Sequence, residues 1–335
     1  MLWLGIDGGG TKTACSLYNN RLERLDRLVL PTCHYAQAGL HGMRDVLAQG
    51  IAWAEERAAQ LDNGKSELGI GFAICGYGEG AKTTSAIDQL VRDVAGAHPY
   101  VLVNDVEAAW AAGLDCADGI AIIAGTGSIA LGVRGGAQIR CGGWDYELGD
   151  EGSGGWLGKE LLRTFTRQAD GRDPRGALYD MVREALDLHD DFDIIAWGQA
   201  HYACRGDVAA VAPIVSRAAA MGDASARAIL ARAAAEEADL VRAIKAQLFD
   251  VEPPVDSDGA RQVAMSAQPP ATGAATRAQC DTIPVTYIGG TFNAGACILE
   301  PLARGLPAGC TLVEPAHEPD LGPVLLLRSR LEHVA

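Results

Sequence analysis

The chain has 335 residues, of which 48% are hydrophobic and 21% are charged, and its formal net charge is −15. This length predicts two domains or one large α/β unit, either of which can bury a full core. The acidic balance and the absence of a polybasic stretch exclude nucleic acid and anionic membrane as expected partners.

The cysteine pattern and the start of the chain indicate the compartment. Nine cysteines are scattered without a CxxC pair, which predicts free thiols in a reducing environment rather than a disulfide framework. The start MLWLGIDGGG lacks a basic region and reaches Asp7 after six residues. We therefore expect neither a signal peptide nor a membrane anchor, and we expect a cytoplasmic protein.

The first third of the chain alternates strand and helix patterns. Residues 2–6 and 14–18 predict two strands joined by a tight glycine turn. Further apolar patterns predict strands at 28–30, 68–75 and 100–103 and helices at 43–61 and 85–94. Such alternation predicts a mixed or parallel sheet.

At Gly119 the opening pattern starts again. A predicted strand at 120–124, the turn GTGS and a returning strand at 129–133 repeat the first hairpin. We interpret this as a second copy of the same module, with the domain boundary between residues 105 and 118.

The second half is predicted to be mostly helical. The clearest helix runs from the expected N-cap Asp223 to Leu248, with one apolar face. Residues 252–282 are rich in Ala, Pro, Ser, Thr and Gly and predict a flexible surface insertion. A strand at 285–288 and a helix at 294–302 follow.

Three glycine-rich turns follow predicted strands, and each could bind a phosphate through backbone N–H groups. They are DGGGTKT at 7–13, AGTGS at 124–128 and IGGTFNAG at 288–295. Two common nucleotide motifs fail. The sequence NGKS at 63–66 has Ala59 where a P-loop needs glycine, and GTGSIA is followed by a strand where a dinucleotide site needs a helix.

Two aspartates end predicted strands, and the first of them, Asp7, lies beside the first glycine turn. Asp7 places a hard carboxylate oxygen where a phosphate-bound Mg²⁺ would lie, and Asp105 begins a helix and could accept a proton from an attacking hydroxyl. A helix cap or a turn residue is the alternative for each. Lys12 could neutralise phosphate or be a solvated turn residue. The polar stretch at 141–155, with Trp144 among carboxylates, suits a sugar or a surface loop.

Together these segments resemble the BadF/BadG/BcrA/BcrD ATPase family, specifically its N-acetylglucosamine and glucosamine kinase branch. The likeness covers most of the chain except the insertion. It rests on the order of LGIDGGGTKT, NDVEAAWAAG, IAGTGSIALGV, CGGWDYELGDEGSGGWLG and YIGGTFNAGACILEPL.

The resemblance implies an α/β protein of the actin-like ATPase fold, with two ribonuclease H-like domains and the active site in the cleft between them. We expect residues 1–115 to form the first domain, with 318–335 packing back on it, and residues 116–317 to form the second. It implies ATP and Mg²⁺ as cofactors, an amino sugar as substrate, and a homodimer.

The resemblance also implies roles for individual residues. Asp105 matches the catalytic base and also contacts the sugar, and Asp7 would hold Mg²⁺ through water. The matched ATP-binding positions are Gly9, Gly10, Thr11, Lys12, Gly125, Thr126, Gly127, Gly289 and Gly290. The matched sugar-binding positions are Ser128, Trp144 and Asp150.

The expected reaction is the transfer of the ATP γ-phosphoryl group to the 6-hydroxyl of N-acetylglucosamine, which is phosphotransfer to an alcohol. Cys33 and Ile129 depart from the pattern of the acetylated-sugar kinases, so glucosamine is the alternative substrate. An ATPase that activates a dehydratase of the 2-hydroxyacyl-CoA type is the alternative of another class. A sugar-responsive regulator ranks below it.

Overall fold

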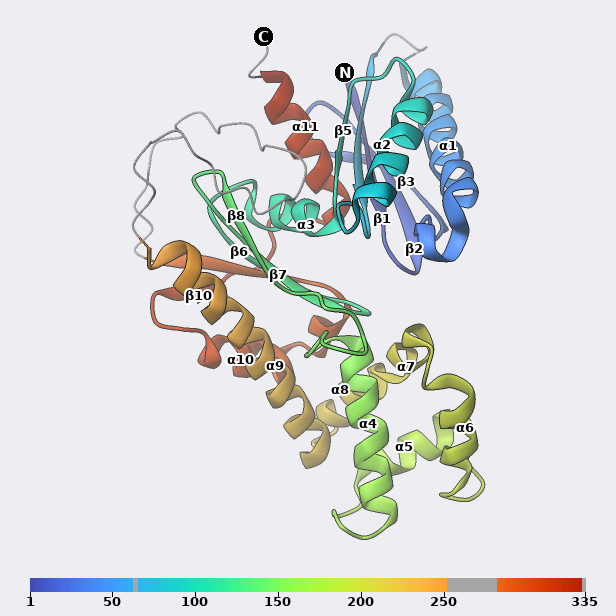
Figure 1. The fold of residues 1–335 in the computed structure, drawn as a ribbon, viewed down its shortest axis with the longest axis vertical. Helices are drawn as coiled ribbons and strands as arrows, with labels where there is room; N and C mark the ends of the chain where they lie inside the picture. Colours follow the sequence, from blue (N-terminus) through green and yellow to red (C-terminus); the bar gives the residue numbers. More distant parts are fainter. Residues whose placement is uncertain (63–65, 252–281, 333–335) are drawn as a thin grey trace.

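The structure, a computed structural model, describes residues 1–62, 66–251 and 282–332 (Figure 1). The expected insertion at 252–282 falls outside these ranges except for its last residue. The described chain forms two five-stranded mixed sheets with helices packed around them. No helix within the described ranges is both long enough and apolar enough to cross a membrane.

The first sheet has the strand order β3-β2-β1-β4-β5. Strand β1 pairs antiparallel with β2 and parallel with β4, so the glycine hairpin lies at the middle of the sheet. Helices cover both faces, α1 and α2 on one and α3 and α11 on the other (Figure 1). This explains why β1 and β4 are nearly continuous apolar runs. The bounds are β1 Leu2–Gly8, β2 Lys12–Tyr18, β3 Arg24–Pro31, α1 Tyr35–Asp62, β4 Leu68–Ile74, α2 Ala81–Ala95, β5 Tyr100–Val103, α3 Asp105–Leu114 and α11 Gly322–Glu332.

The second sheet repeats this topology as β8-β7-β6-β9-β10, with the same antiparallel and parallel pairings. The repeat predicted at Gly119 is therefore confirmed. Helix α3 contributes to an apolar cluster that contains residues of both sheets, among them Val103 and Leu131. The strand bounds are β6 Gly119–Ala124, β7 Ser128–Arg134, β8 Ala137–Gly142, β9 Ile283–Ile288 and β10 Cys310–Leu312.

The remaining helices pack around the second sheet or extend away from it (Figure 1). The predicted helix at 223–248 is present as α9 followed by a π-helical turn, Lys245–Phe249. Its N-cap is Asp223 as predicted, because the side chain accepts a hydrogen bond from the Ala226 N–H at 2.9 Å. The bounds are α4 Gly154–Ala169, α5 Ala177–Ala185, α6 Asp193–His201, α7 Arg205–Val211, α8 Pro213–Ala220, α9 Ala224–Ile244 and α10 Ala296–Gly305.

The end of the described chain returns to the first sheet. Asp320 is buried, and its carboxylate accepts hydrogen bonds from the hydroxyls of Ser16 at 2.5 Å and Tyr18 at 2.9 Å. A Cβ on Gly5 would lie 1.8 Å from the Asp320 carbonyl oxygen, so only glycine permits this close approach. Residues about 300 positions apart in sequence are thereby held together, and α11 then crosses the sheet.

Candidate active site

Polar residues gather where the parallel strands of the first sheet end. Asp7 lies at the end of β1, Cys75 directly follows β4, and Asp105 follows β5 as the first residue of α3. Asn104 caps this helix by accepting a hydrogen bond from the Glu107 N–H at 2.7 Å. The carboxyl ends of neighbouring parallel strands meet at one edge, so the two aspartates face the same region.

The first glycine turn is a closed loop. The Gly9 N–H donates to the Lys12 carbonyl at 3.1 Å, and the Thr32 hydroxyl donates to the Gly9 carbonyl at 2.8 Å. Cys33 is buried beneath the loop, since a Cβ on Gly8 would lie 2.4 Å from its sulfur. Cys33 is one of the two positions that depart from the pattern of the acetylated-sugar kinases. Its thiol packs below the first glycine turn.

The second glycine turn rests on the N-terminus of α4. The N–H groups of Gly154 and Gly155 donate to the carbonyls of Gly125 and Thr126, at 2.7 and 3.1 Å. The third turn packs against it, because a Cβ on Gly289 would lie 2.3 Å from the Ala124 carbonyl oxygen. Two of the predicted glycine turns are thus joined at one end of the second sheet.

Asp150 is the buried carboxylate beside the second turn. It is only 3% exposed, and its φ of +57° is unusual for a residue other than glycine. A Cβ on Gly127 would lie 2.6 Å from its Oδ2, so this glycine permits the contact. The Ser128 hydroxyl holds the same loop by donating to the Glu151 carbonyl at 2.6 Å. Trp144, by contrast, is 71% exposed.

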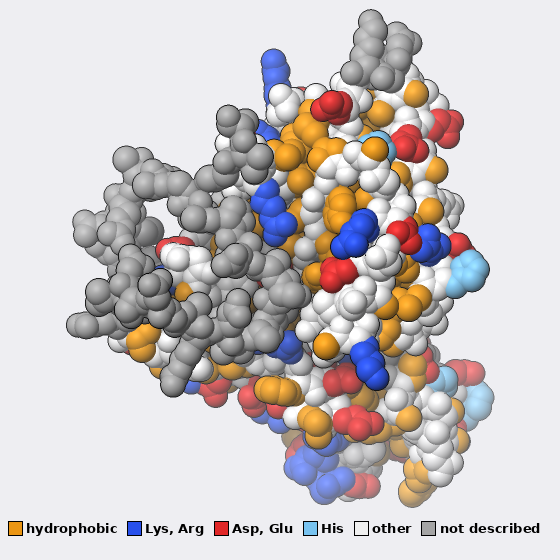
Figure 2. All heavy atoms as spheres, turned by 45° about the horizontal axis from the view of Figure 1, so that its top comes forward, with side chains coloured by type: hydrophobic (Ala, Val, Ile, Leu, Met, Phe, Trp, Pro, Cys, Tyr) orange, Lys and Arg blue, Asp and Glu red, His pale blue; other side chains and the backbone are white. Residues whose placement is uncertain are grey.

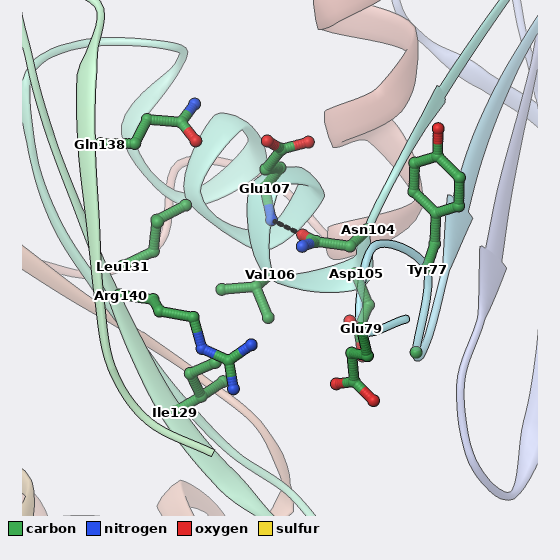
Figure 3. A pocket seen from close by; sticks show the side chains of 11 residues that line it. Tyr77, Glu79, Asn104, Asp105, Val106, Glu107, Ile129, Leu131, Gln138 and Arg140 are labelled. Carbon is green, nitrogen blue, oxygen red and sulfur yellow. Dashed lines mark hydrogen bonds between the residues drawn. The ribbon is translucent and has the colours of Figure 1, made fainter. Parts of the chain in front are cut away.

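A pocket lies between the two sheets, beside the N-terminus of α3 (Figure 3). Asn104 and Asp105 contribute from the first sheet's side, and Arg140 faces them from β8. Its lining residues are Gly76, Tyr77, Glu79, Asn104, Asp105, Val106, Glu107, Ile129, Leu131, Gln138 and Arg140. The pocket therefore brings acidic and basic side chains together at one place.

Burial dominates the electrostatics of the two aspartates. Burial raises the pKa of Asp7 to about 7, with the negative charges of Asp105 and Asp320 adding to the effect. Burial also raises the pKa of Asp105 above its ordinary value, while a hydrogen bond from Cys75 and two backbone N–H groups lower it. The charge of Asp105 is thus one of the causes that raise the pKa of Asp7.

Arg205 of α7 pairs with carboxylates of the loop that carries Asp150. Its guanidinium lies 3.0 Å from a carboxylate oxygen of Asp145 and 3.7 Å from one of Asp150. The same positive charge lowers the pKa of His34, after burial as the larger cause. Glu79 and Asp105 act on His34 in the opposite direction. Arg205 therefore contacts the Asp150 loop, and its charge acts on the pKa of His34.

Several of these groups were not singled out from the sequence. Among the predicted sugar-binding residues, Asp105 lines the pocket of Figure 3, whereas Ser128, Trp144 and Asp150 lie outside its lining. Glu79 and Arg140 line the pocket and were missed. Glu79 could have been found in the sequence, because it belongs to the GYGEG turn that follows a predicted strand.

The strand order of both sheets and the pocket between them define a fold that solved sugar kinases share. The chain is similar over its whole length to a solved glucokinase of the ROK family from Streptomyces griseus, in complex with glucose and AMPPNP. The TM-score is 0.55, the identity is 14%, and all of each chain is covered. A second structure, from Chromobacterium violaceum and provisionally named an N-acetylglucosamine kinase, has a TM-score of 0.71 and 24% identity and covers 97% of this chain and 98% of its own. The predicted fold class is confirmed.

The sequence comparisons are more specific. A profile of the BadF/BadG/BcrA/BcrD ATPase family matches residues 4–326. The N-acetylmuramic acid/N-acetylglucosamine kinase of Clostridium acetobutylicum is 30% identical, covering 70% of this chain and 76% of its own. The N-acetyl-D-glucosamine kinase of Dictyostelium discoideum is 29% identical, covering 72% and 79%. The glucosamine kinase of Vibrio cholerae is 27% identical, covering 59% and 65%. The chain belongs to the BadF/BadG/BcrA/BcrD ATPase family.

Proposed function

We propose that this protein is an ATP-dependent amino-sugar kinase that transfers the γ-phosphoryl group to the 6-hydroxyl of N-acetylglucosamine. The names of the relatives support a sugar kinase, that is, a phosphotransferase with an alcohol acceptor. The observation that carries the proposal is Asp105, which lies at the N-terminus of α3 in a pocket between the two sheets.

Asp105 would act as the general base. An ionised carboxylate can accept the proton of the sugar hydroxyl as that oxygen attacks the γ-phosphorus in line with the leaving ADP oxygen. Burial raises the pKa of Asp105, which makes the carboxylate a better proton acceptor once ionised. Closure of the two halves over the pocket would exclude water and limit hydrolysis of ATP.

The glycine turns would hold the nucleotide. Their backbone N–H groups can face phosphate oxygens without a Cβ in the way. We propose that the phosphates contact Gly9, Gly10, Thr11, Lys12, Gly125, Thr126 and Gly127, and that adenosine lies against Gly289 and Gly290. The acidic net charge of −15 does not oppose this, since backbone groups and a cation supply the positive potential.

The residues present fit a magnesium ion. Asp7 is a partly buried carboxylate beside the first glycine turn, and Mg²⁺ prefers one or two carboxylates together with phosphate oxygens and retained water. When bound, Mg²⁺ would neutralise the charge that develops on the phosphate oxygens. Asp7 would hold it through water and orient it toward the first glycine turn.

The sugar would be bound by Asp105, Ser128, Trp144 and Asp150. Asp150 and Ser128 are held on one loop, and the exposed indole of Trp144 offers an apolar surface for a sugar ring. Glucosamine is the second candidate, because its ammonium group would be favoured by Glu79 and Asp105 on the pocket wall.

Together with this function we propose a domain organisation, a cellular location and an oligomeric state. Residues 1–115 with 318–335 would form one domain and residues 116–317 the other, and the protein would be a cytoplasmic homodimer. On the face shown in Figure 2, acidic and basic side chains are interspersed, which gives polyanions no continuous basic patch.

One assay tests the function directly. ATP-coupled turnover is measured with N-acetylglucosamine, glucosamine, glucose and N-acetylmuramic acid, and without sugar. We expect the highest kcat/KM with N-acetylglucosamine, and a loss of about 100-fold or more in kcat for Asp105→Asn with its fold retained. ATP hydrolysis that is equally fast without any sugar would favour the dehydratase activator instead, and near-normal turnover of the variant would remove Asp105 from the mechanism.

A further inference from the structure

Arg205 bridges two carboxylates of the loop between β8 and α4. Its guanidinium Nη1 donates a hydrogen bond to Oδ1 of Asp145 at 3.0 Å and lies 3.7 Å from Oδ2 of Asp150. These aspartates stand at the two ends of residues 145–150, directly after the exposed Trp144. The proposed function assigns Arg205 no role.

The two ion pairs of Arg205 differ in their exposure to water. The side chain of Asp145 is 76% exposed, so its pair is screened and contributes little to stability. The side chain of Asp150 is only 4% exposed, so its attraction to the guanidinium is screened much less. No other ion pair of Asp150 is present within the described ranges of the chain. Arg205 therefore supplies the counter-charge of a buried carboxylate, which would be costly to leave unpaired.

The backbone of residues 145–150 needs contacts to keep its shape. Asp145 has a φ of +73° and Asp150 a φ of +57°, which are uncommon for residues other than glycine. The N–H groups of Leu148 and Gly149 close the turn by donating to the Asp145 carbonyl at 3.3 and 2.8 Å. The guanidinium of Arg205 reaches both ends of this segment, so its removal takes away the tie between them.

Arg205 is itself held in place by packing that does not depend on the ion pairs. It is the first residue of α7, and a Cβ on Gly158 of α4 would lie 2.0 Å from the Val208 carbonyl oxygen of α7. The two helices therefore touch through their backbones, which only glycine permits. Shortly before α7, the Tyr202 carbonyl accepts a hydrogen bond from the Tyr146 hydroxyl at 3.1 Å.

We propose that Arg205 is a positioning residue for sugar binding, whose guanidinium holds the Asp150 carboxylate in the orientation that accepts hydrogen bonds from the sugar hydroxyls. The proposal rests on the proposed function and on the sugar-binding role of Asp150 within it. Asp150 would contact the sugar rather than the transferred phosphoryl group. Loss of its orientation therefore weakens sugar binding more than it slows the chemical step.

The test is a double-mutant cycle of Arg205→Gln and Asp150→Asn, read by steady-state kinetics with N-acetylglucosamine and ATP. We expect Arg205→Gln to raise the KM for the sugar by about tenfold, with the KM for ATP and kcat changed by less than about twofold. In the Asp150→Asn background it should have no further effect, because the group that Arg205 orients is already altered. Arg205→Lys keeps the charge and should lie between the wild type and Arg205→Gln. Arg167→Gln, which breaks the pair with Asp173 at the other end of α4, is the matched control.

Equal rises in the two KM values, additive effects in the cycle, or a lysine variant no better than the glutamine variant would each overturn the proposal. If Arg205→Gln does not fold, Arg205→Lys takes its place in the cycle, and its effect must disappear in the Asp150→Asn background. Failure of the kinase function is separate, because it is judged by the sugar-dependent turnover of the wild type. Should that turnover be absent, hydrogen exchange of residues 144–151 tests the positioning. Exchange should be faster in Arg205→Gln than in Arg167→Gln, and equal exchange contradicts the proposal.

Discussion

Glu237 of α9 is a buried carboxylic acid whose two oxygens have no hydrogen-bond partner among the described residues. It lies among Ala233, Ala234 and Ala238 on the apolar face of the helix. Burial raises the pKa of Glu237 well above its ordinary value of 4.5. We predict that Glu237→Gln, which has the same shape and no charge, is more stable than the wild type at neutral pH.

The sign follows from the two states of the protein. Below about pH 4.5 Glu237 is protonated in the folded and unfolded chains alike, so the variant and the wild type differ little. Above this pH the unfolded chain ionises while the folded chain keeps its proton, so the wild type loses stability until the pH passes the folded-state pKa. The difference in free energy of unfolding should therefore grow by about 1.4 kcal/mol per pH unit and then level off.

The assay is urea denaturation of the wild type and the variant in steps of about one pH unit across the acid to neutral range. Glu236→Gln changes the exposed neighbour on the same helix and serves as the matched control. Parallel stability curves for Glu237→Gln and the wild type would show that Glu237 is ionised or paired in the folded protein, and would refute the reasoning.

Three further predictions concern the groups that hold the site. Asp320→Ala removes the acceptor for two buried hydroxyls and should lower the free energy of unfolding by about 3 kcal/mol, and an unchanged urea midpoint would contradict this. Gly127→Ala places a Cβ 2.6 Å from the Asp150 carboxylate. It should lower kcat/KM for the sugar by about 100-fold, with a normal Tm, and wild-type kinetics would show that the loop adjusts freely. Because the pKa of Asp7 is about 7, protonation should weaken the apparent Mg²⁺ affinity by about tenfold per pH unit below that value. This is measured from the Mg²⁺ dependence of turnover, and a flat affinity would exclude Asp7 as the group that holds the ion.

Local sequence patterns were sufficient to predict the central hairpin of each sheet. A glycine turn between two apolar strands occurs at Asp7 and again at Gly125, and both hairpins are present with the same strand order around them. The position of Asp105 also followed from local features, since a buried strand ends there and a helix begins. These elements depend on contacts between residues close in sequence, which periodicity and turn chemistry describe.

Strands β8 and β10 were missed for different reasons. Strand β8 follows the pair Gly135 and Gly136, both with positive φ, which is typical of a hairpin turn. Its alternation is obscured because the polar residues Gln138 and Arg140 line the pocket. Strand β10 has only three residues and is defined by its parallel pairing with β9, a long-range contact that no local pattern contains.

The tertiary surroundings of Arg205 and Glu237 also lay beyond local prediction. Arg205 lies in a short helix of the second half, and only the tertiary fold brings it near His34 and the Asp150 loop. Glu237 lies four residues from Ala233 and from Val241, so periodicity places it on the apolar face of α9, and only the tertiary packing buries that face in the core. Sequence periodicity predicts which residues share a face but does not report what that face packs against.

The loop that carries Asp150 departs from local rules at several positions. Asp150 has a positive φ, and Gly127 and Gly152 are needed where side chains approach. Glu237 belongs to the same region, since a Cβ on Gly152 would lie 3.2 Å from its Oε1. Strain and an unpaired buried carboxyl each lower stability, and such costs persist where the geometry serves a function. Both costs occur in or beneath the loop that carries Asp150, and this is a physical argument that the loop serves a function.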